Sequence, residues 1–499
     1  MNSAGIQSPR PTSQLSLAAG SDLAARAGGS ALLEGKAEPL DTYSRFRTVV
    51  GNSLLIAVLS PFIALTAGYV PRILLAVVIL DIPFQFGTHL FYREVDAARG
   101  ALGGLSISVT TIALAGLYVS WFIRSQATRN PQERPSVNIN LPLLLYLAIT
   151  AISVFVAQDV SLSLFEVFLL LEACLVYFYV ASNVRTRQDV LFVVSLLLIA
   201  CLLESLAMIV LKFTGMPSTI WGVPTHVHID TDAKEGFMRI GGTVGSSNFA
   251  AAYLSISLAS ATSLLFTKLG RAHKWLAMAV LGLGGVALIF TFSRGGWMAL
   301  ALSLTLICLL GWRRLGFSLK TPMAILLILG MLYLPFHGVI SARLLGDDKG
   351  SAESRIPLMK LAFRIIEDNP ILGVGANNFT VVMDRYLTPE FRTGFLFAVH
   401  NKYLLVLSET GIVGLLAFLA FLLDALRKGW QCWSRQDRLL SPLALGFAAG
   451  IAGHMVHMSV DVFRGRPTQQ LVWLMAGLLT AMLRMGQPRP TADPFSYIT

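Results

Sequence analysis

Residues 189–212 read DVLFVVSLLLIACLLESLAMIVLK and hold one internal charge, Glu204, between Asp189 and Lys212. A helix needs about 20 mostly apolar residues to cross a bilayer. Comparable stretches recur along nearly the whole chain, which is only 13% charged, against about 25% in a soluble domain. Lipid cannot satisfy backbone polar groups, and a β-barrel would show short alternating segments. We therefore expect an all-α polytopic membrane protein.

The chain divides at its polar segments. Residues 1–48 are rich in Ser, Ala and Gly, and we expect a disordered tail there. We expect a transmembrane bundle over 49–340, a large outward loop over 341–399, further transmembrane helices over 400–485 and a cytoplasmic tail over 486–499. The candidate spans are 50–67, 70–87, 104–123, 140–157, 163–182, 189–212, 245–266, 274–293, 296–311, 321–339, 400–424, 441–463 and 467–485. Pro61 and Pro71 interrupt the first two, so the expected number of transmembrane helices is 12 to 13, and 12 with both ends inside is preferred.

The basic residues set the orientation. The loops 124–139, 182–189, 267–275, 312–321 and 425–440 together hold 15 Lys or Arg and 3 acidic residues, whereas 341–399 holds seven of each. The positive-inside rule therefore places these five loops in the cytoplasm and the segments 213–243 and 341–399 outside. The net charge of +11 does not indicate nucleic-acid binding, because the basic residues are dispersed and form no basic face.

The outward segment contains one predicted helix. After Pro357, apolar residues recur at helical spacing and the pattern stops at Asn369-Pro370; they are Leu358, Leu361, Ala362, Ile365 and Ile366. This helix would lie flat on the bilayer with Lys360, Arg364 and Glu367 toward water, or pack on the transmembrane bundle.

Polar side chains gather near the outward ends of the predicted spans. They are Arg239, which precedes the glycine-rich run 241–245 and Asn248, Arg294 in the turn at 292–297, Arg355, and His400 with Asn401. A guanidinium group donates paired hydrogen bonds to phosphate oxygens and stays charged. These arginines, with backbone N–H groups of 241–245, can hold a diphosphate without a metal. The alternative is that Arg239 and Arg294 only meet lipid headgroups.

A histidine is suited to take a proton from an attacking sugar hydroxyl near neutral pH, and His400 stands where a span meets the polar loop. Other matches are weaker: His226, His228 and Asp230 as a metal site, Asp230-Thr231-Asp232 as a nucleotide-sugar motif, and Gly373-Val374-Gly375 as a dinucleotide motif. His454, His457 and Asp461 are spaced to share one helix face, as a polar pathway or as structural pairs. The cysteines Cys174, Cys201, Cys308 and Cys432 are expected to be small apolar residues.

Four segments, in order, resemble the O-antigen ligase and polymerase superfamily. Residues 400–414, HNKYLLVLSETGIVG, resemble its H-N-x-[YF]-L…E-x-G-[IL]-x-G segment. Residues 369–379, NPILGVGANNF, resemble its hP-hhG-x-G-x-x-x-F segment. FSRG at 292–295 and RIGGTVGSSN at 239–248 resemble its S-R-[GS] turn and its R-x-x-G-x-x-x-x-x-N stretch.

The resemblance implies a bundle like that of C-type glycosyltransferases. The implied activity is inverting and metal-independent, needs no cofactor, and moves a glycan from an undecaprenyl-pyrophosphate donor to a glycan or lipid A core acceptor. By matching position, His400 would be the catalytic base, Arg294 and Arg239 would bind the donor pyrophosphate, and Arg355 would assist. Asn401, Asn248 and Glu409 match supporting positions, and Glu409 points away from His400 if both continue one helix.

The implied location is the bacterial inner membrane, with the site facing the periplasm in contact with the lipid bilayer. The shared motifs do not separate a ligase from a polymerase of O-antigen or exopolysaccharide, although the extended tail and long loop favour a polymerase. The alternative from another class is a flippase or transporter of lipid-linked oligosaccharide. Such proteins place polar groups near the membrane midplane, often with an internal repeat.

Overall fold

The computed structural model describes residues 69–127, 138–215, 219–220, 223–230, 237–314, 355–388, 396–435 and 437–485, with a few positions between 330 and 341. All of them belong to one compact unit, Leu54–Thr499. The predicted tails 1–48 and 486–499, the span 50–67 and nearly all of the span 321–339 lie outside the described residues, as does much of 341–354.

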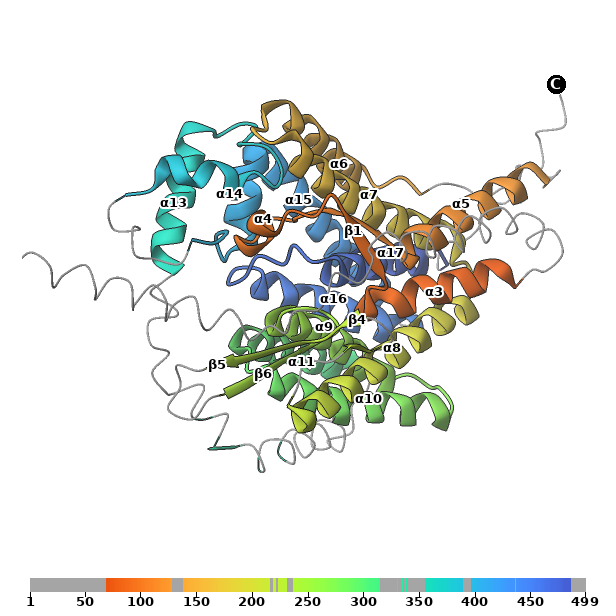
Figure 1. The fold of residues 1–499 in the computed structure, drawn as a ribbon. Coiled ribbons are helices and arrows are strands. Elements are labelled where there is room, and N and C mark those ends of the chain that lie inside the picture. The colour runs from red at the N-terminus through yellow and green to blue at the C-terminus, as the bar shows by residue number, and fades with distance from the viewer. Residues whose placement is uncertain are drawn as a thin grey trace, which may run out of the picture. The chain divides into compact units, whose positions relative to one another are not determined.

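Long helices form the bundle, and each falls on a predicted span (Figure 1). They are α3 (Val70–Phe84), α5 (Val109–Ala127), α6 (Leu141–Ile152), α7 (Val160–Asn183), α8 (Arg187–Thr214), α9 (Ser247–Leu265), α10 (Arg271–Phe290), α11 (Arg294–Arg314), α15 (Lys402–Ser434), α16 (Leu440–His457) and α17 (Arg466–Met485). Within the described residues, seven helices are long and apolar enough to cross a membrane. The expected all-α polytopic membrane fold is confirmed, and the total of 12 to 13 spans stays a prediction.

Side-chain caps fix where several helices begin. Asp159 accepts a hydrogen bond from Leu162 N at the start of α7, and Ser246 caps α9 in the same way. Thr186 and Asp189 form a reciprocal capping box on α8. Such caps satisfy backbone N–H groups that the first turn leaves unpaired.

Helix α9 is the centre of the bundle and is buried along nearly its whole length. It packs against α16, α10 and α11. Its sequence is dominated by Ala and Ser, which allow close approach of neighbouring backbones, as is common between membrane helices. At one such contact, a β-carbon on Gly446 of α16 would lie 2.2 Å from Ser263 Oγ.

Short antiparallel strand pairs connect some of the helices. They are β1 (Gly87–Leu90) with β2 (Leu105–Ser108), β3 (Thr219–Ile220) with β4 (Val223–Pro224), and β5 (His226–Asp230) with β6 (Phe237–Gly242). The short helix α4 (Glu94–Ala98) lies between the first two. Strand β6 leads toward α9 and carries Arg239 opposite His228 of β5.

The predicted amphipathic helix is α13 (Arg355–Asp368), and it is followed by α14 (Phe379–Val382) and the 3-10 turn η3 (Met383–Tyr386). Four of the five predicted apolar positions are buried, namely Leu358, Leu361, Ala362 and Ile365. They pack in a cluster with Phe379, Leu405 and Val462, and α13 lies against α15. The second alternative is therefore correct: α13 buries its apolar face on the bundle and not in the bilayer.

Helix α15 contains a break at Gly411, whose φ of 66° and ψ of −172° are not helical. The segment 370–375 fills this break: Ile412 N donates to Pro370 O, Val374 N to Ser408 O and Gly375 N to Glu409 O. Beyond the break α15 continues to Ser434, ten residues past the predicted end at 424. The prediction of that boundary was wrong, and Lys428 pairs with Asp424 one turn earlier at 2.6 Å in the added stretch.

Candidate functional site

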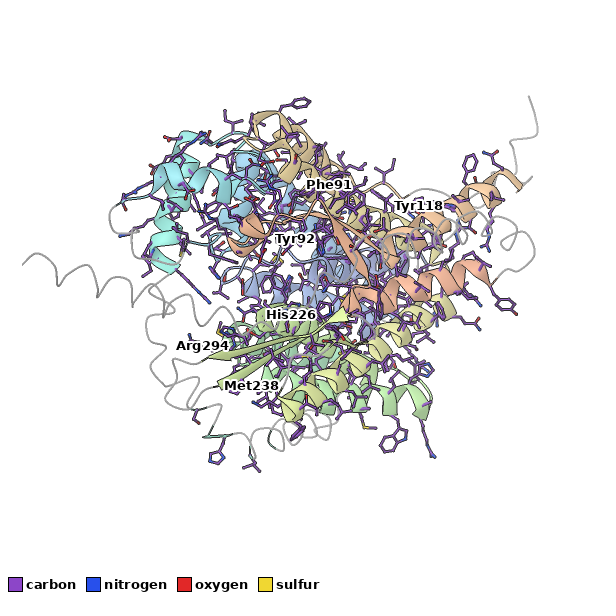
Figure 2. All side chains as sticks on the ribbon, in the orientation of Figure 1. Phe91, Tyr92, Tyr118, His226, Met238 and Arg294 are labelled. Carbon is purple, nitrogen blue, oxygen red and sulfur yellow. The ribbon has the colours of Figure 1, made fainter. Side chains whose placement is uncertain are left out.

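A polar pocket of about 70 Å³ brings together parts of the chain that are far apart in sequence. Its lining residues are Arg239, Asn248, Phe292, Ser293, Arg294, Gly295, Arg355, His457, Val460 and Asp461. The three arginines and Asn248 were proposed from the sequence, and the structure places all four in one pocket. Figure 2 labels Arg294, and three helices, α9, α11 and α13, begin at this pocket.

Hydrogen bonds link the pocket's polar groups into a chain. Arg239 Nε donates to Thr291 O at 3.1 Å, and its Nη2 donates to Asn248 Oδ1 at 2.9 Å. Asn248 Nδ2 in turn donates to Asp461 Oδ2 at 2.5 Å, while Asp461 Oδ1 accepts from Val462 N at 2.7 Å. Asn248 is thus oriented from both sides, which fixes Arg239 and Asp461 relative to each other.

The turn before α11 places Arg294. Phe292 has a φ of 52°, and Ser293 caps the helix by accepting from Gly296 N at 3.4 Å. Arg294 is therefore the first helical residue, at the rim of the pocket. The next residue, Gly295, lies against the ring of His457, so residue 295 has no room for a side chain.

Arg355 reaches the pocket from α13. Because the apolar face of this helix is packed on the cluster around Phe379 and Leu405, its first residue is held in a defined place. Arg239, Arg294 and Asp461 are supplied by separate elements, so the pocket depends on the tertiary fold. The three guanidinium groups and one carboxylate give the pocket a net charge of plus two.

His400 does not line this pocket but lies beside it. Burial lowers the pKa of His400 below its usual value, the Asp461 carboxylate raises it and the Arg355 guanidinium lowers it, with a lowered pKa as the result. Its ring packs against that of Phe397, tilted by 32° with 5.2 Å between the centroids, and its buried Nδ1 has no hydrogen-bond partner among the described residues. A lowered pKa keeps this imidazole neutral near pH 7, the form that accepts a proton.

His457 and Asp461 do not share a helix face. Helix α16 ends at His457, and Asp461 lies four residues beyond, in the connection to α17. The predicted common face was wrong for Asp461, because Met458 O accepts from Lys402 N where a longer helix would continue. His454 and His457 both pack against Phe463, in a tilted and an edge-on contact with ring centroids 4.8 Å and 4.6 Å apart, and of the two only His457 lines the pocket.

The glycine-rich run 241–245 serves the fold. Thr243 N donates to Glu204 Oε1 at 2.9 Å, and Thr243 Oγ1 donates to Glu204 Oε2 at 2.5 Å. Gly242 has a φ of 64° and faces the same carboxylate, with 2.0 Å from a β-carbon to Glu204 Oε1. This run does not line the pocket, so the expectation that its N–H groups face a diphosphate finds no support at Thr243.

The other supporting candidates are Asn401 and Glu409. Asn401 binds backbone N–H groups, and Glu409 forms an ion pair. Asn401 caps α15, since its Oδ1 accepts from Tyr403 N and Leu404 N, each at 3.0 Å. Glu409 Oε1 accepts from Phe379 N at 3.1 Å and from Arg464. Both residues hold the elements around His400 in place.

Buried ion pairs surround the connection between α16 and α17, and no sequence pattern predicted them. Arg464 pairs with Glu409 and lies 3.9 Å from Glu166 Oε2, while Arg466 lies 3.2 Å from Glu172 Oε2. All are buried. Arg464 is separated from Asp461 by only two residues, so its pair with Glu409 anchors the connection that carries Asp461.

Within the described residues, the weaker sequence matches do not form the metal or nucleotide sites that they resemble. His226 and His228 lie on β5, and the described residues contain no group of three or more His, Cys, Asp or Glu side chains placed to hold a metal. Asp232 lies outside the described residues. Gly373 and Gly375 pack against Glu409 and Ala157 as part of the junction with α15. The four cysteines are unpaired, and three of them are buried.

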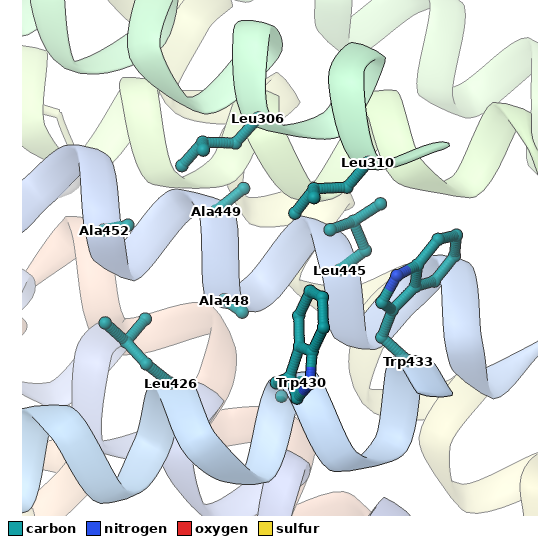
Figure 3. Close-up of a pocket in the computed structure, with 10 residues that line it drawn as sticks. Leu306, Leu310, Leu426, Trp430, Trp433, Leu445, Ala448, Ala449 and Ala452 are labelled. Carbon is teal, nitrogen blue, oxygen red and sulfur yellow. The ribbon is translucent and has the colours of Figure 1, made fainter. Parts of the chain in front are cut away.

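An apolar pocket of about 130 Å³ lies deeper along the same helices (Figure 3). Leu306 and Leu310 of α11 form one side, Leu426, Trp430 and Trp433 of α15 the other, and alanines of α16 lie between them. Leu306 is 12 residues beyond Arg294, so it lies about 18 Å further along α11 than the polar pocket.

Comparison with known proteins identifies the central part of the chain. Residues 277–419 match the family described as O-antigen ligase, a range that holds Arg294, Arg355, His400 and Glu409. No curated protein matches the chain. A chain from the solved structure described as "Structural coordination of polymerization and crosslinking by a peptidoglycan synthase complex" aligns with 70% of this chain and 98% of its own length. Its identity is 16% and its TM-score 0.36, which is too low to support an argument. The match over residues 277–419 supports the resemblance of this multi-pass membrane protein to the O-antigen ligase and polymerase superfamily.

Proposed function

We propose that this protein is a membrane glycosyltransferase of O-antigen or exopolysaccharide assembly. It moves a glycan from an undecaprenyl-pyrophosphate carrier to a hydroxyl group of an acceptor. The observation that carries the proposal is the polar pocket, where Arg239, Arg294 and Arg355 converge. The match of residues 277–419 to the O-antigen ligase family supports the same reaction class.

The pocket suits a pyrophosphate in charge and in geometry. The two phosphates of a lipid–glycan pyrophosphate carry one negative charge each. Together they balance the net charge of plus two that three arginines and Asp461 give the pocket. The N-terminal ends of α9 and α11 add the positive ends of helix dipoles. The residues thus stabilise the charge that develops on the leaving group as the glycosidic bond breaks.

His400 is the proposed base. Its lowered pKa keeps the ring neutral, so that it can take the proton of the acceptor hydroxyl as that oxygen attacks the anomeric carbon. The lipid pyrophosphate leaves with the electron pair of the broken bond, and Asp461 stabilises the imidazolium that forms. Because attack and departure occur on opposite sides of the anomeric carbon, one displacement inverts its configuration.

We place this site at the periplasmic face of the inner membrane. The pocket lies where α9 and α11 begin and α16 ends, and the basic connections, such as 182–189 and 267–275, lie at the opposite helix ends. The positive-inside rule assigns those connections to the cytoplasm. The apolar pocket between α11, α15 and α16 would then take part of the donor's polyprenyl tail inside the membrane.

A transfer assay tests the proposal. Purified His400→Ala, Arg294→Ala and a control, Lys360→Ala on the exposed face of α13, are compared with wild type, using lipid-linked donor and acceptor in vesicles. We expect the first two variants to lose transfer and the control to keep it. Full activity of both site variants would refute the assignment. A flippase would be favoured if wild type moved the lipid-linked glycan across the membrane without transferring it, and if the site variants lost this translocation.

A further inference from the structure

A second pocket, lined by both polar and apolar residues, lies at the other end of α13 and is not used by the proposed reaction. Its volume is about 480 Å³, against about 70 Å³ for the pyrophosphate pocket. The lining residues are Val156, Gln158, Asn369, Pro370, Ile371, Leu372, Gly373, Val374, Val382, Arg385 and Tyr386. The polar side chains are two amides, a phenol and a guanidinium, and none of the lining residues is acidic.

The floor of this pocket is rigid. It consists of the backbone of 369–374, which is bound to the break in α15 through Ile412 N to Pro370 O at 2.9 Å and Val374 N to Ser408 O at 3.0 Å. Gly373 allows this contact, since a β-carbon there would lie 2.4 Å from Glu409 C. A floor fixed in this way exists before a ligand arrives.

The walls are fixed as well. Gln158 stands between Ala157, which packs on Gly375, and Asp159, whose N–H donates to Asn378 Oδ1 at 2.7 Å. On the other side, Asp384 pairs with Arg99 at 2.9 Å, which anchors the turn η3 that carries Arg385 and Tyr386. Across the pocket, Asn369 Nδ2 donates to Tyr386 Oη at 3.4 Å.

The two pockets are joined by one helix. Arg355 at the start of α13 lines the pyrophosphate pocket, and Asn369, one residue after its end, lines the second pocket. Along 14 residues the helix axis advances about 20 Å. A glycan attached at the first pocket would need several sugar units to reach the second.

We propose that this second pocket is a saccharide-binding site, which holds a sugar unit several residues away from the reacting bond. The Gln158 amide offers a donor and an acceptor for neighbouring hydroxyl groups. Asn369 Oδ1 offers a further acceptor, while its Nδ2 donates to Ile365 O and Tyr386 Oη. Arg385 adds further donors, and Tyr386 gives an aromatic wall. The sugar belongs to the donor glycan or to the acceptor glycan. This inference depends on the proposed function for its ligand class.

Direct binding tests it without catalysis. The probe is the oligosaccharide released by mild acid from the lipid-linked donor, which has neither lipid nor pyrophosphate, and affinity is measured with the full-length protein in detergent. Losing charge-assisted hydrogen bonds at this pocket should weaken binding about tenfold in Arg385→Gln with Gln158→Ala. Arg294→Ala and the control Lys360→Ala should bind the probe like wild type. Unchanged affinity in the double variant, or equal losses in Lys360→Ala, would overturn the proposal.

Kinetics with substrates of different length identify which glycan occupies the pocket. With long donor and long acceptor, Arg385→Gln should raise one KM, by less than the loss of about tenfold expected for the double variant, and leave kcat unchanged. Shortening the glycan that occupies the pocket to one sugar should abolish this difference, whereas shortening the other should not. A KM effect that persists with both substrates shortened contradicts a distal saccharide site. Transfer that survives Arg294→Ala would instead disprove the proposed function.

Discussion

Gly295 lies directly against the imidazole of His457: a β-carbon on residue 295 would stand 2.5 Å from His457 Cδ2 and 2.7 Å from Nε2. The residue beside Arg294 therefore has to be the smallest one. Any side chain at 295 must move either the ring or the start of α11, and both carry groups of the polar pocket that contains Arg294.

Gly295→Ala should lower kcat/KM about 100-fold, because displacing a binding group by about 1 Å costs that much in a positioned reaction. The measurement is glycan transfer by purified protein. Gly282→Ala in α10 is the matched control, since a β-carbon there meets nothing within 4 Å. Equal transfer by both variants would show that this close contact has no catalytic importance.

The activity should fall on the acid side when His400 is protonated. The pKa of His400 is lowered below the usual histidine value of about 6.5. Wild-type kcat should therefore still be at its full level at a pH of about 6.5 and should decline only at lower pH. Asp461 raises the pKa of His400, so Asp461→Asn should shift the acid limb to lower pH, and Arg355→Gln should shift it to higher pH. A pH–rate profile at saturating donor checks both directions. A limb that stays in place in both variants would assign it to another group.

Breaking the ion pair between Arg464 and Glu409 should destabilise the protein. Glu409→Ala leaves a buried guanidinium without its carboxylate, which typically costs about 3–5 kcal/mol. Thermal unfolding in detergent measures it, and Glu367→Ala on the exposed face of α13 is the control. A midpoint for Glu409→Ala that equals the control would mean that Glu166 alone compensates Arg464.

The apolar pocket should sense the length of the donor's tail. Ala452→Phe places a large ring among the α16 alanines of that pocket and should raise the KM for the full-length polyprenyl donor, without affecting a donor analogue with a short tail. Leu309→Phe, at an exposed position of α11 outside the lining, is the control. An equal KM for the two tail lengths in Ala452→Phe would exclude this pocket as the tail site.

Much of this fold could be predicted from local pattern. The apolar spans could be predicted from their length and composition. The buried face of α13 could be predicted because its apolar residues recur at helical spacing. The arginines could be found because each stands next to a recognisable turn or helix start. No local signal predicted the end of α16, since neither Gly nor Pro stands between His457 and Asp461, and a hydrogen bond from the distant Lys402 takes up Met458 O.

Long-range pairing explains the remaining misses. Arg464 and Glu409 are 55 residues apart in the sequence, so no local pattern in either segment predicts their contact. The glycine-rich run 241–245 was misjudged for a similar reason, because its partner Glu204 lies in another helix. The glycines at 373 and 411 have one shared cause, the close backbone junction between 370–375 and α15, whereas Gly375 lies against Ala157.

The central claim is that three converging arginines bind a pyrophosphate, and competition binding tests it most directly. Undecaprenyl pyrophosphate and undecaprenyl monophosphate compete with labelled donor for wild type and for Arg294→Gln, each in vesicles of the same neutral lipid. We predict that wild type prefers the pyrophosphate at least about tenfold, since hydrogen bonds to charged groups contribute about 1.5–3 kcal/mol, and that Arg294→Gln loses most of this preference. An unchanged preference in Arg294→Gln would contradict the assignment of this pocket to the pyrophosphate.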